Sequence, residues 1–109
     1  MTITLPPTLK DYFAAKNRHD IEAMLAPFAG DAVVRDEGRT HRGRVEIGAW
    51  MTETTKKYRV SVEPTEASSA GDQWTVAGLV SGNFPGSPAT LHYRFTLAGD
   101  RIAGLEIGA

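Results

Sequence analysis

The sequence predicts an α+β fold in which three short helices pack against a curved antiparallel sheet. Residues 8–54 carry apolar side chains mainly at helical spacing, whereas residues 58–107 carry them mainly at every second position. Helices and strands that are grouped in this way favour α+β over an alternating parallel architecture. Two glycines within the long strand expected over residues 73–84 indicate that the sheet bends.

Two helices are expected at the start of the chain. The first begins at Thr8, a residue type that can cap a helix N-terminus, and closes at residues 17–19. Its apolar stripe includes the stem of Lys16. Asp20 is expected to cap the second helix, which stops near Pro27. The inward positions of this second helix recur at intervals of three and four residues: Ile21, Met24, Leu25 and Phe28.

A short strand and a third helix are expected next. The strand covers residues 31–36, and the turn-rich segment 37–43 links it to the helix. One face of this helix carries Ile47, Trp50, Met51 and Thr54.

The rest of the chain predicts strands over residues 58–66, 73–84 and 90–97, followed by a last strand. Pro64 marks a sheet edge or a bulge in the first of these strands. The third strand alternates most clearly, so His92 and Arg94 are expected on the outer face of the sheet. Its inward positions are Leu91, Tyr93, Phe95 and Leu97.

Composition and charge exclude several kinds of partner. Of the 109 residues, 41% are hydrophobic and 23% are charged, which is typical of one globular domain. The net charge is −1, and bases and acids are interleaved, so we expect neither nucleic acid nor a membrane surface as a partner. No stretch approaches the ~20 apolar residues that span a bilayer, and the N-terminus lacks a signal-peptide core. We therefore expect a cytoplasmic protein.

Cofactor chemistry is not indicated by the sequence. The absence of cysteine excludes disulfides, thiolate nucleophiles and zinc–thiolate sites. The three histidines, His19, His41 and His92, lack the spacing of metal ligands. No glycine-rich loop leads from a strand into a helix, as a phosphate-binding loop would. We therefore expect neither a metal ion nor an organic cofactor.

Five segments, taken in order, carry a family resemblance. They are YFAAKNRHD (12–20), FAGDAVVRD (28–36), GRVEIGAW (43–50), LHYRF (91–95) and GDRIAG (99–104). Together they resemble the SnoaL-like branch of the nuclear transport factor 2-like superfamily. The resemblance implies one SnoaL-like domain over residues 1–109, folded as a cystatin-like α+β cone. In this cone a curved antiparallel sheet wraps around three N-terminal helices.

The resemblance does not choose an activity, because this fold hosts isomerases, cyclases, dehydratases, hydrolases and non-catalytic proteins. It does imply a homodimer formed through the outer sheet face. The expected outer face is small and polar, with residues such as Thr75, His92 and Thr96, and a two-fold contact can be built from such side chains.

Ketosteroid isomerase is the closest functional comparison within this superfamily. The resemblance implies that Tyr12 is an oxyanion-hole donor and that Asp36 is the general base. Leu91 stands where that family has a protonated aspartate, and Met51 stands where it has a supporting tyrosine. Because only two of four functional positions match, ketosteroid isomerase activity itself is not predicted.

Proton abstraction next to a carbonyl group needs a base near the C–H bond and a donor near the oxygen. Asp36 could be the base if an apolar wall raises its pKa by desolvation. Tyr12 could be the donor, with Tyr93 as a second one. Such a site suits an activated substrate, for example a β-keto compound. The residues expected to contact the substrate are Trp50, Phe84, Tyr93, Phe13, Leu91 and Phe95.

Alternatives remain open at each position. Asp36 could instead cap a turn, and Tyr12 could be a core residue with its hydroxyl at the rim. At the level of function, the protein could be an isomerase or cyclase that acts on a small apolar carbonyl compound with Asp36 as base. It could also be a non-catalytic protein that binds a small apolar ligand, or a dimerisation module. The sequence alone does not decide whether it is an enzyme.

Overall fold

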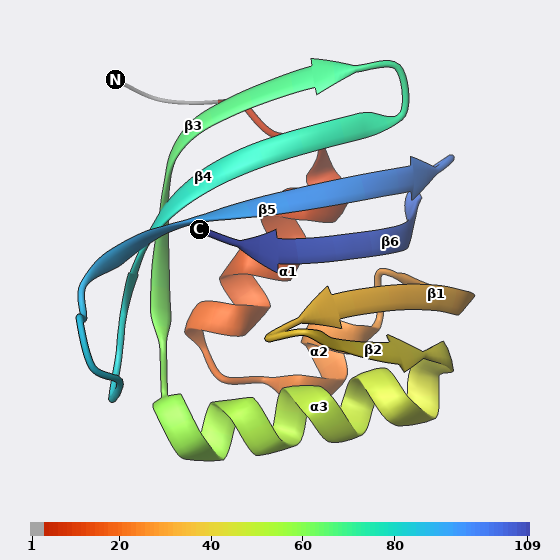
Figure 1. Ribbon diagram of the computed structural model, residues 1–109. Helices are drawn as coiled ribbons and strands as arrows, with labels where there is room; N and C mark the ends of the chain where they lie inside the picture. Colours follow the sequence, from red (N-terminus) through yellow and green to blue (C-terminus); the bar gives the residue numbers. More distant parts are fainter. Residues whose placement is uncertain (1–3) are drawn as a thin grey trace.

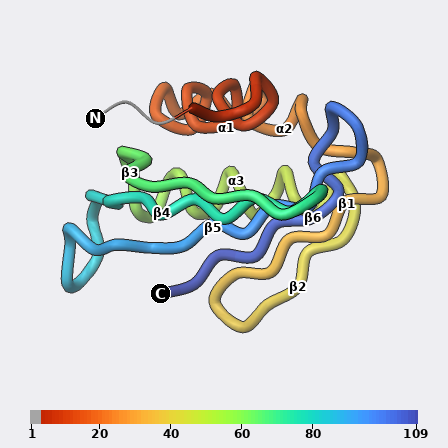
Figure 2. The backbone as a smooth tube through the Cα atoms, turned by 90° about the horizontal axis from the view of Figure 1, so that it is seen from above, coloured from red at the N-terminus to blue at the C-terminus, as the bar shows by residue number. Residues whose placement is uncertain are grey.

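A computed structural model describes residues 4–109 as helices packed against a curved six-stranded sheet (Figure 1). Figure 2 shows α1 and α2 as a layer on one side of the sheet. In Figure 1, α3 runs along the edge of the sheet that β2 and β1 form. The elements are α1 (Pro7–Asn17), α2 (Ile21–Leu25), β1 (Phe28–Asp36), β2 (Arg39–Arg42), α3 (Gly43–Tyr58), β3 (Ser61–Ala70), β4 (Gln73–Ser81), β5 (Ala89–Ala98) and β6 (Arg101–Gly108).

The strand order across the sheet is β2-β1-β6-β5-β4-β3. All neighbouring pairs are antiparallel except β1 and β6, which are parallel, so the sheet is mixed. A register shift in β3 between Pro64 and Glu66 confirms the bulge expected at the proline. At the bend of β4, a Cβ atom on Gly78 would lie 2.7 Å from Cγ1 of Val62. The close approach of β3 and β4 therefore requires glycine at this position.

The core lies between α1 and the concave face of the sheet. Tyr12 of α1 makes edge-to-face contacts with Phe13, Phe28 and Phe95, at ring-centroid distances of 5.2, 5.8 and 5.5 Å. These rings are almost fully buried, and each such pair adds about 0.5–1.5 kcal/mol beyond the burial of its area. The helical spacing of Leu9, Tyr12 and Phe13 places all three on this face, as the sequence predicts.

Several boundaries differ from those expected from the sequence. Thr8 does not cap α1, which begins at Pro7 after Pro6; the Thr8 hydroxyl instead donates to the carbonyl of Asp100 at 2.8 Å. Asp20 does cap α2, accepting from the backbone N–H of Ala23 at 3.1 Å. The second helix ends at Leu25, before Phe28, whose ring packs on Tyr12 from the start of β1.

The expected linker over residues 37–43 contains a strand instead, because Arg39–Arg42 pairs antiparallel with the end of β1. The strand predicted from residue 58 begins at Ser61, since α3 continues to Tyr58. The strand predicted to reach residue 84 ends at Ser81. Over residues 4–109, no helix is both long enough and apolar enough to cross a bilayer.

Candidate active site

A cavity of about 630 Å³ opens at one end of the molecule. Its boundaries are the last turn of α1, the β1–β2 turn, the second half of α3 and the loop between β4 and β5. The first half of β5 and the end of β6 form the floor of the cavity. Three helices and a bent sheet thus leave space at one end that the core does not fill.

Asp36 is half-buried on the wall of this cavity, at the end of β1. The indole N–H of Trp50 in α3 donates to its Oδ2 at 3.1 Å. Desolvation by burial raises the pKa of Asp36, and the hydrogen bond from Trp50 opposes this effect without cancelling it. A half-buried carboxylate with a raised pKa and one oxygen already held is the arrangement that a general base requires.

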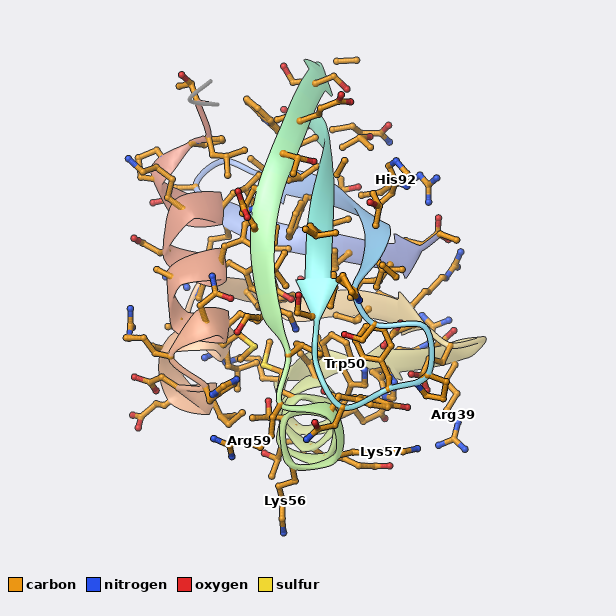
Figure 3. The ribbon with its side chains drawn as sticks, turned by 90° about the vertical axis from the view of Figure 1, so that its left-hand side faces the viewer. Arg39, Trp50, Lys56, Lys57, Arg59 and His92 are labelled. Atoms are coloured by element: carbon orange, nitrogen blue, oxygen red, sulfur yellow. The ribbon has the colours of Figure 1, made fainter. Side chains whose placement is uncertain are left out.

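Trp50 is held in turn by its surroundings. It is 7% exposed, and its ring stacks on His41 of β2, with 5.7 Å between centroids and 27° between ring planes. Figure 3 shows Trp50 directed from α3 towards the sheet, whereas Lys56 and Lys57 of the same helix point away from the protein. The indole is therefore fixed in the orientation that holds the Asp36 carboxylate.

Lys16 is the site residue whose position the sequence does not reveal. It shares the buried face of α1 and is only 9% exposed, yet it lines the cavity that contains Asp36. Desolvation lowers the pKa of Lys16 to about 8, and the negative charge of Asp36 partly opposes this shift. A basic residue within an otherwise apolar helical stripe is the only sequence signal for this position.

The amine of Lys16 does not form an ion pair with Asp36. Among residues 4–109, nitrogen–oxygen ion pairs within 4.0 Å join Arg18 to Asp20 and Arg94 to Glu106. The Lys16 amine therefore lies more than 4.0 Å from the Asp36 carboxylate oxygens, although each group influences the pKa of the other.

The structure brings together five of the eight predicted site residues. Those that line the cavity are Asp36, Trp50, Phe84, Leu91 and Tyr93. Their chemical roles are not tested by geometry alone and stay predictions.

The other three predicted residues, Tyr12, Phe13 and Phe95, do not line the cavity and belong to the aromatic cluster behind it. The ring of Phe13 contacts that of Tyr93 at 5.3 Å, which connects the cluster to the cavity wall. The hydroxyl of Tyr12 is buried and has no hydrogen-bond partner in the described part of the chain. Burial raises the pKa of the Tyr12 and Tyr93 phenols, and the charge of Asp36 adds to this effect.

Three residues that line the cavity, His19, Glu37 and Tyr58, are not predicted as site residues by the sequence. The Tyr58 hydroxyl donates to Oε1 of Glu37 at 3.2 Å, and its ring meets Phe84 edge-on at 6.3 Å. His19 has a positive φ of 58° and places Nε2 2.9 Å from the carbonyl oxygen of Val60. These contacts join segments that are distant in the sequence, so no local pattern signals them.

A family model for the SnoaL-like domain matches residues 9–105. The chain belongs to the SnoaL-like family. A proposed polyketide cyclase from Sinorhizobium meliloti is 46% identical over 94% of both chains, with a TM-score of 0.91. A comparison with curated proteins gives no match.

Two further solved structures resemble this SnoaL-like protein. One, from Catenulispora acidiphila, has a ketosteroid isomerase-like fold and was crystallised with trimethylamine. It is 26% identical, with a TM-score of 0.85, over 97% of this chain and 87% of that chain. A cystatin-fold protein from Novosphingobium aromaticivorans is 18% identical, with a TM-score of 0.78 over 94% and 95% of the two chains, and supports the fold alone. The predicted cystatin-like α+β cone is thereby confirmed, with one parallel strand pair in its sheet.

Family membership and the Sinorhizobium neighbour support a role of the cyclase or isomerase type for this SnoaL-like protein. Within residues 4–109, no three histidine, aspartate or glutamate side chains are grouped so that they could hold a metal ion. The titratable groups that line the cavity are the carboxylates of Asp36 and Glu37, the amine of Lys16, the imidazole of His19 and the phenols of Tyr58 and Tyr93.

Proposed function

We propose that this SnoaL-like protein isomerises or cyclises a small, mostly apolar carbonyl compound by proton transfer, with Asp36 as the general base. One observation carries the proposal: a half-buried carboxylate, held by an indole N–H, faces a largely apolar cavity of about 630 Å³. This volume is within the range of small-molecule sites. The resemblance to a proposed polyketide cyclase points to the same class of substrate.

The reaction begins when Asp36 removes a proton from the carbon next to the carbonyl group. Trp50 donates to Oδ2 and so holds the carboxylate that removes the proton in a fixed orientation. The raised pKa of Asp36 brings the carboxylate closer to the basicity at which proton transfer is most efficient, and such a base contributes about 10²–10⁴-fold in rate. The resulting enolate is reprotonated at another carbon in an isomerase, or attacks a second carbonyl carbon in a cyclase.

The enolate oxygen needs hydrogen-bond donors. Tyr93 lines the cavity and is the nearer candidate. Tyr12 lies behind the wall with an unpartnered hydroxyl, and buried polar groups without a partner are uncommon. We propose Tyr12 as a second donor; because it does not line the cavity, this role requires the wall in front of its hydroxyl to shift when the substrate binds.

The base assignment is tested by replacing Asp36→Asn and following hydrogen–deuterium exchange of small enolisable ketones and β-diketones by NMR. We expect the exchange rate to fall by about 10²-fold or more, because the base is lost while the shape of the side chain is kept. Asp31→Asn, an exposed carboxylate on the same strand, is the matched control and should exchange like the wild type. Equal rates for the wild type and Asp36→Asn on every compound would disprove the assignment.

A non-catalytic ligand-binding role is the second candidate, favoured by the complex of the Catenulispora neighbour with trimethylamine. In that case Asp36 would pair with a small cationic amine next to the aromatic rings of Trp50 and Phe84. Isothermal titration with trimethylamine distinguishes the two roles. Saturable binding that is lost in Asp36→Asn, with no exchange on any ketone, would favour the binding role.

We also propose a homodimer formed through the outer face of the sheet. Figure 3 shows His92 on the side of the sheet away from α1, and its Nδ1 is buried without a described hydrogen-bond partner. Arg94 and Glu106 lie beside it as an exposed ion pair of 3.7 Å. Analytical ultracentrifugation should give twice the chain mass, and Thr75→Arg on the same face should give the monomer.

A further inference from the structure

We propose that Lys16 is a nucleophilic amine that captures the substrate carbonyl group as an iminium ion, on which Asp36 then acts. The inference rests on the proposed function for its substrate class, a small aldehyde or ketone. It adds a covalent step and a second reacting residue to the base chemistry described above.

The position of Lys16 in the fold supports a reactive role for its amine. Lys16 is in the last turn of α1, on the same stripe as Tyr12 and Phe13, and nine-tenths of its side chain is buried. A structural lysine in this setting extends its amine to solvent or pairs with a carboxylate. Lys16 has no carboxylate within 4.0 Å among residues 4–109, and the space that it lines is the cavity that also contains Asp36.

The protonation state of the Lys16 amine also supports its role as a nucleophile. Burial lowers the pKa of Lys16 to about 8. At pH 7.5 roughly one Lys16 amine in four is then neutral, compared with about one in a thousand for a lysine of ordinary pKa. Only the neutral amine has a free lone pair, so desolvation in an apolar pocket is one of the ways in which proteins activate lysine as a nucleophile.

The separation of the Lys16 amine from the Asp36 carboxylate suits a reaction in which both groups take part. Lys16 and Asp36 line one cavity without touching, and each is close enough to change the pKa of the other. A carbonyl carbon bound to the amine would put the neighbouring carbon in the cavity whose wall carries Asp36. The base is then placed to remove a proton from that carbon.

The chemistry balances without an added oxidant or reductant. The Nζ lone pair forms a bond to the carbonyl carbon, the nitrogen loses one proton, and the carbonyl oxygen takes one up, which gives a neutral carbinolamine. This hydroxyl leaves as water after a second protonation, which gives the iminium ion. Asp36 removes the α-proton, and the C–H electron pair neutralises the nitrogen as an enamine. Reprotonation at carbon, or attack of the enamine carbon on a second carbonyl, is followed by hydrolysis that frees the amine.

The iminium ion would also compensate for a shortage of hydrogen-bond donors. The inner wall presents the apolar Leu91 next to the phenol of Tyr93, and the Tyr12 hydroxyl is behind the wall. A positively charged nitrogen accepts the electron pair from the α-carbon directly, so fewer donors are needed to stabilise an oxyanion.

The test uses pentane-2,4-dione, which condenses with a neutral amine to a stable enaminone and releases one water molecule. The protein is incubated with the dione at pH 7.5, and the modified lysine is identified by peptide mass mapping. We expect Lys16 to react at least tenfold faster than the exposed lysines Lys10, Lys56 and Lys57, two of which are labelled in Figure 3. Propanal with cyanoborohydride is a smaller second probe and should also modify Lys16 first.

Two variants serve as controls. Lys16→Arg keeps the positive charge but should lose the fast reaction, whereas Lys56→Arg should keep it. Reaction of Lys16 no faster than the exposed lysines with both probes would overturn the inference.

Asp36→Asn separates this inference from the proposed function, because capture needs the amine and not the base. Lys16 should still react quickly in Asp36→Asn, while substrate exchange is lost. Fast labelling together with unchanged exchange would contradict the base assignment alone. Absent labelling in the wild type, with exchange that depends on Asp36, would contradict the role of Lys16 alone.

Discussion

One helix builds both the most tightly packed region of this SnoaL-like protein and its cavity. At Tyr12, three aromatic rings of α1 and the sheet surround the side chain at centroid distances below 6 Å. One turn later, Lys16 lines a cavity, more than 4.0 Å from the Asp36 carboxylate on the same cavity wall. Just beyond Lys16, Asn17 exchanges two hydrogen bonds with the backbone of Val62 at the start of β3, and Figure 1 shows β3 and β4 bending along their length. We infer that stability depends mainly on the first region and chemistry on the second.

The largest effect is expected in the aromatic cluster. Phe95→Ala should lower the free energy of unfolding by about 3–5 kcal/mol, because a 1% exposed ring leaves a void among fixed neighbours. Phe84→Ala, on the half-buried cavity wall, should cost about 1 kcal/mol, since solvent already reaches this ring. Urea denaturation measures both values. Equal losses would mean that the cavity wall is packed as tightly as the core.

Lys16 should destabilise the fold at neutral pH. Lys16→Met should raise the free energy of unfolding by about 1–3 kcal/mol at pH 7, because the variant buries no charge. The folded protein binds fewer protons than the unfolded chain between pH 8 and 10, so wild-type stability should rise with pH in this window. Above pH 10 the buried phenols of Tyr12 and Tyr93 reverse this trend, because their raised pKa favours proton binding in the folded state.

The contribution of Lys16 is measured as the difference between the free energies of unfolding of the wild type and Lys16→Met at each pH. Subtracting the unfolding profile of Lys16→Met from that of the wild type removes the contributions of the Tyr12 and Tyr93 phenols. The remaining difference should shrink from pH 8 upwards. A difference independent of pH would show that the Lys16 amine keeps an ordinary pKa.

Tyr12 tests whether the two regions are separate. Tyr12→Phe removes a buried hydroxyl without a partner, so the free energy of unfolding should rise by about 1–2 kcal/mol. If Tyr12 is also an oxyanion donor, the ketone exchange rate should fall by about 10²-fold. A gain in stability with no loss of rate would place Tyr12 in the core alone. Tyr93→Phe is the matched variant on the cavity wall.

The sequence predicts the parts of this molecule that depend on local periodicity. The stripe of α1 and the alternation of β5 are confirmed, since apolar spacing directly reports which face is buried. β2 was missed because Arg39–Arg42 has no apolar alternation and is a strand only through its pairing with β1. The parallel pairing of β1 with β6 joins residues distant in the chain, which no local pattern encodes.

The site was less predictable than the fold for a related reason. Phe28 fits a helical spacing and a strand start equally well, and its true position decides how Tyr12 is packed. Lys16 was correctly placed on the apolar stripe, but whether its amine reaches solvent depends on the bend of strands much later in the sequence. The family resemblance therefore pointed to the carboxylate, whereas the position of the amine required the assembled fold.

The smallest effect is expected at the hydrogen bond between Trp50 and Asp36. Trp50→Phe keeps the aromatic stacking but removes the N–H donor, so the pKa of Asp36 should rise further, by less than about one unit for a bond worth about 1 kcal/mol. NMR titration of the Asp36 carboxyl carbon measures this shift. Because Lys16 lowers the pKa of the same carboxyl, Lys16→Met should move it in the same direction. A lower pKa of Asp36 in either variant would contradict the stabilisation of its carboxylate by the Trp50 indole and the Lys16 amine.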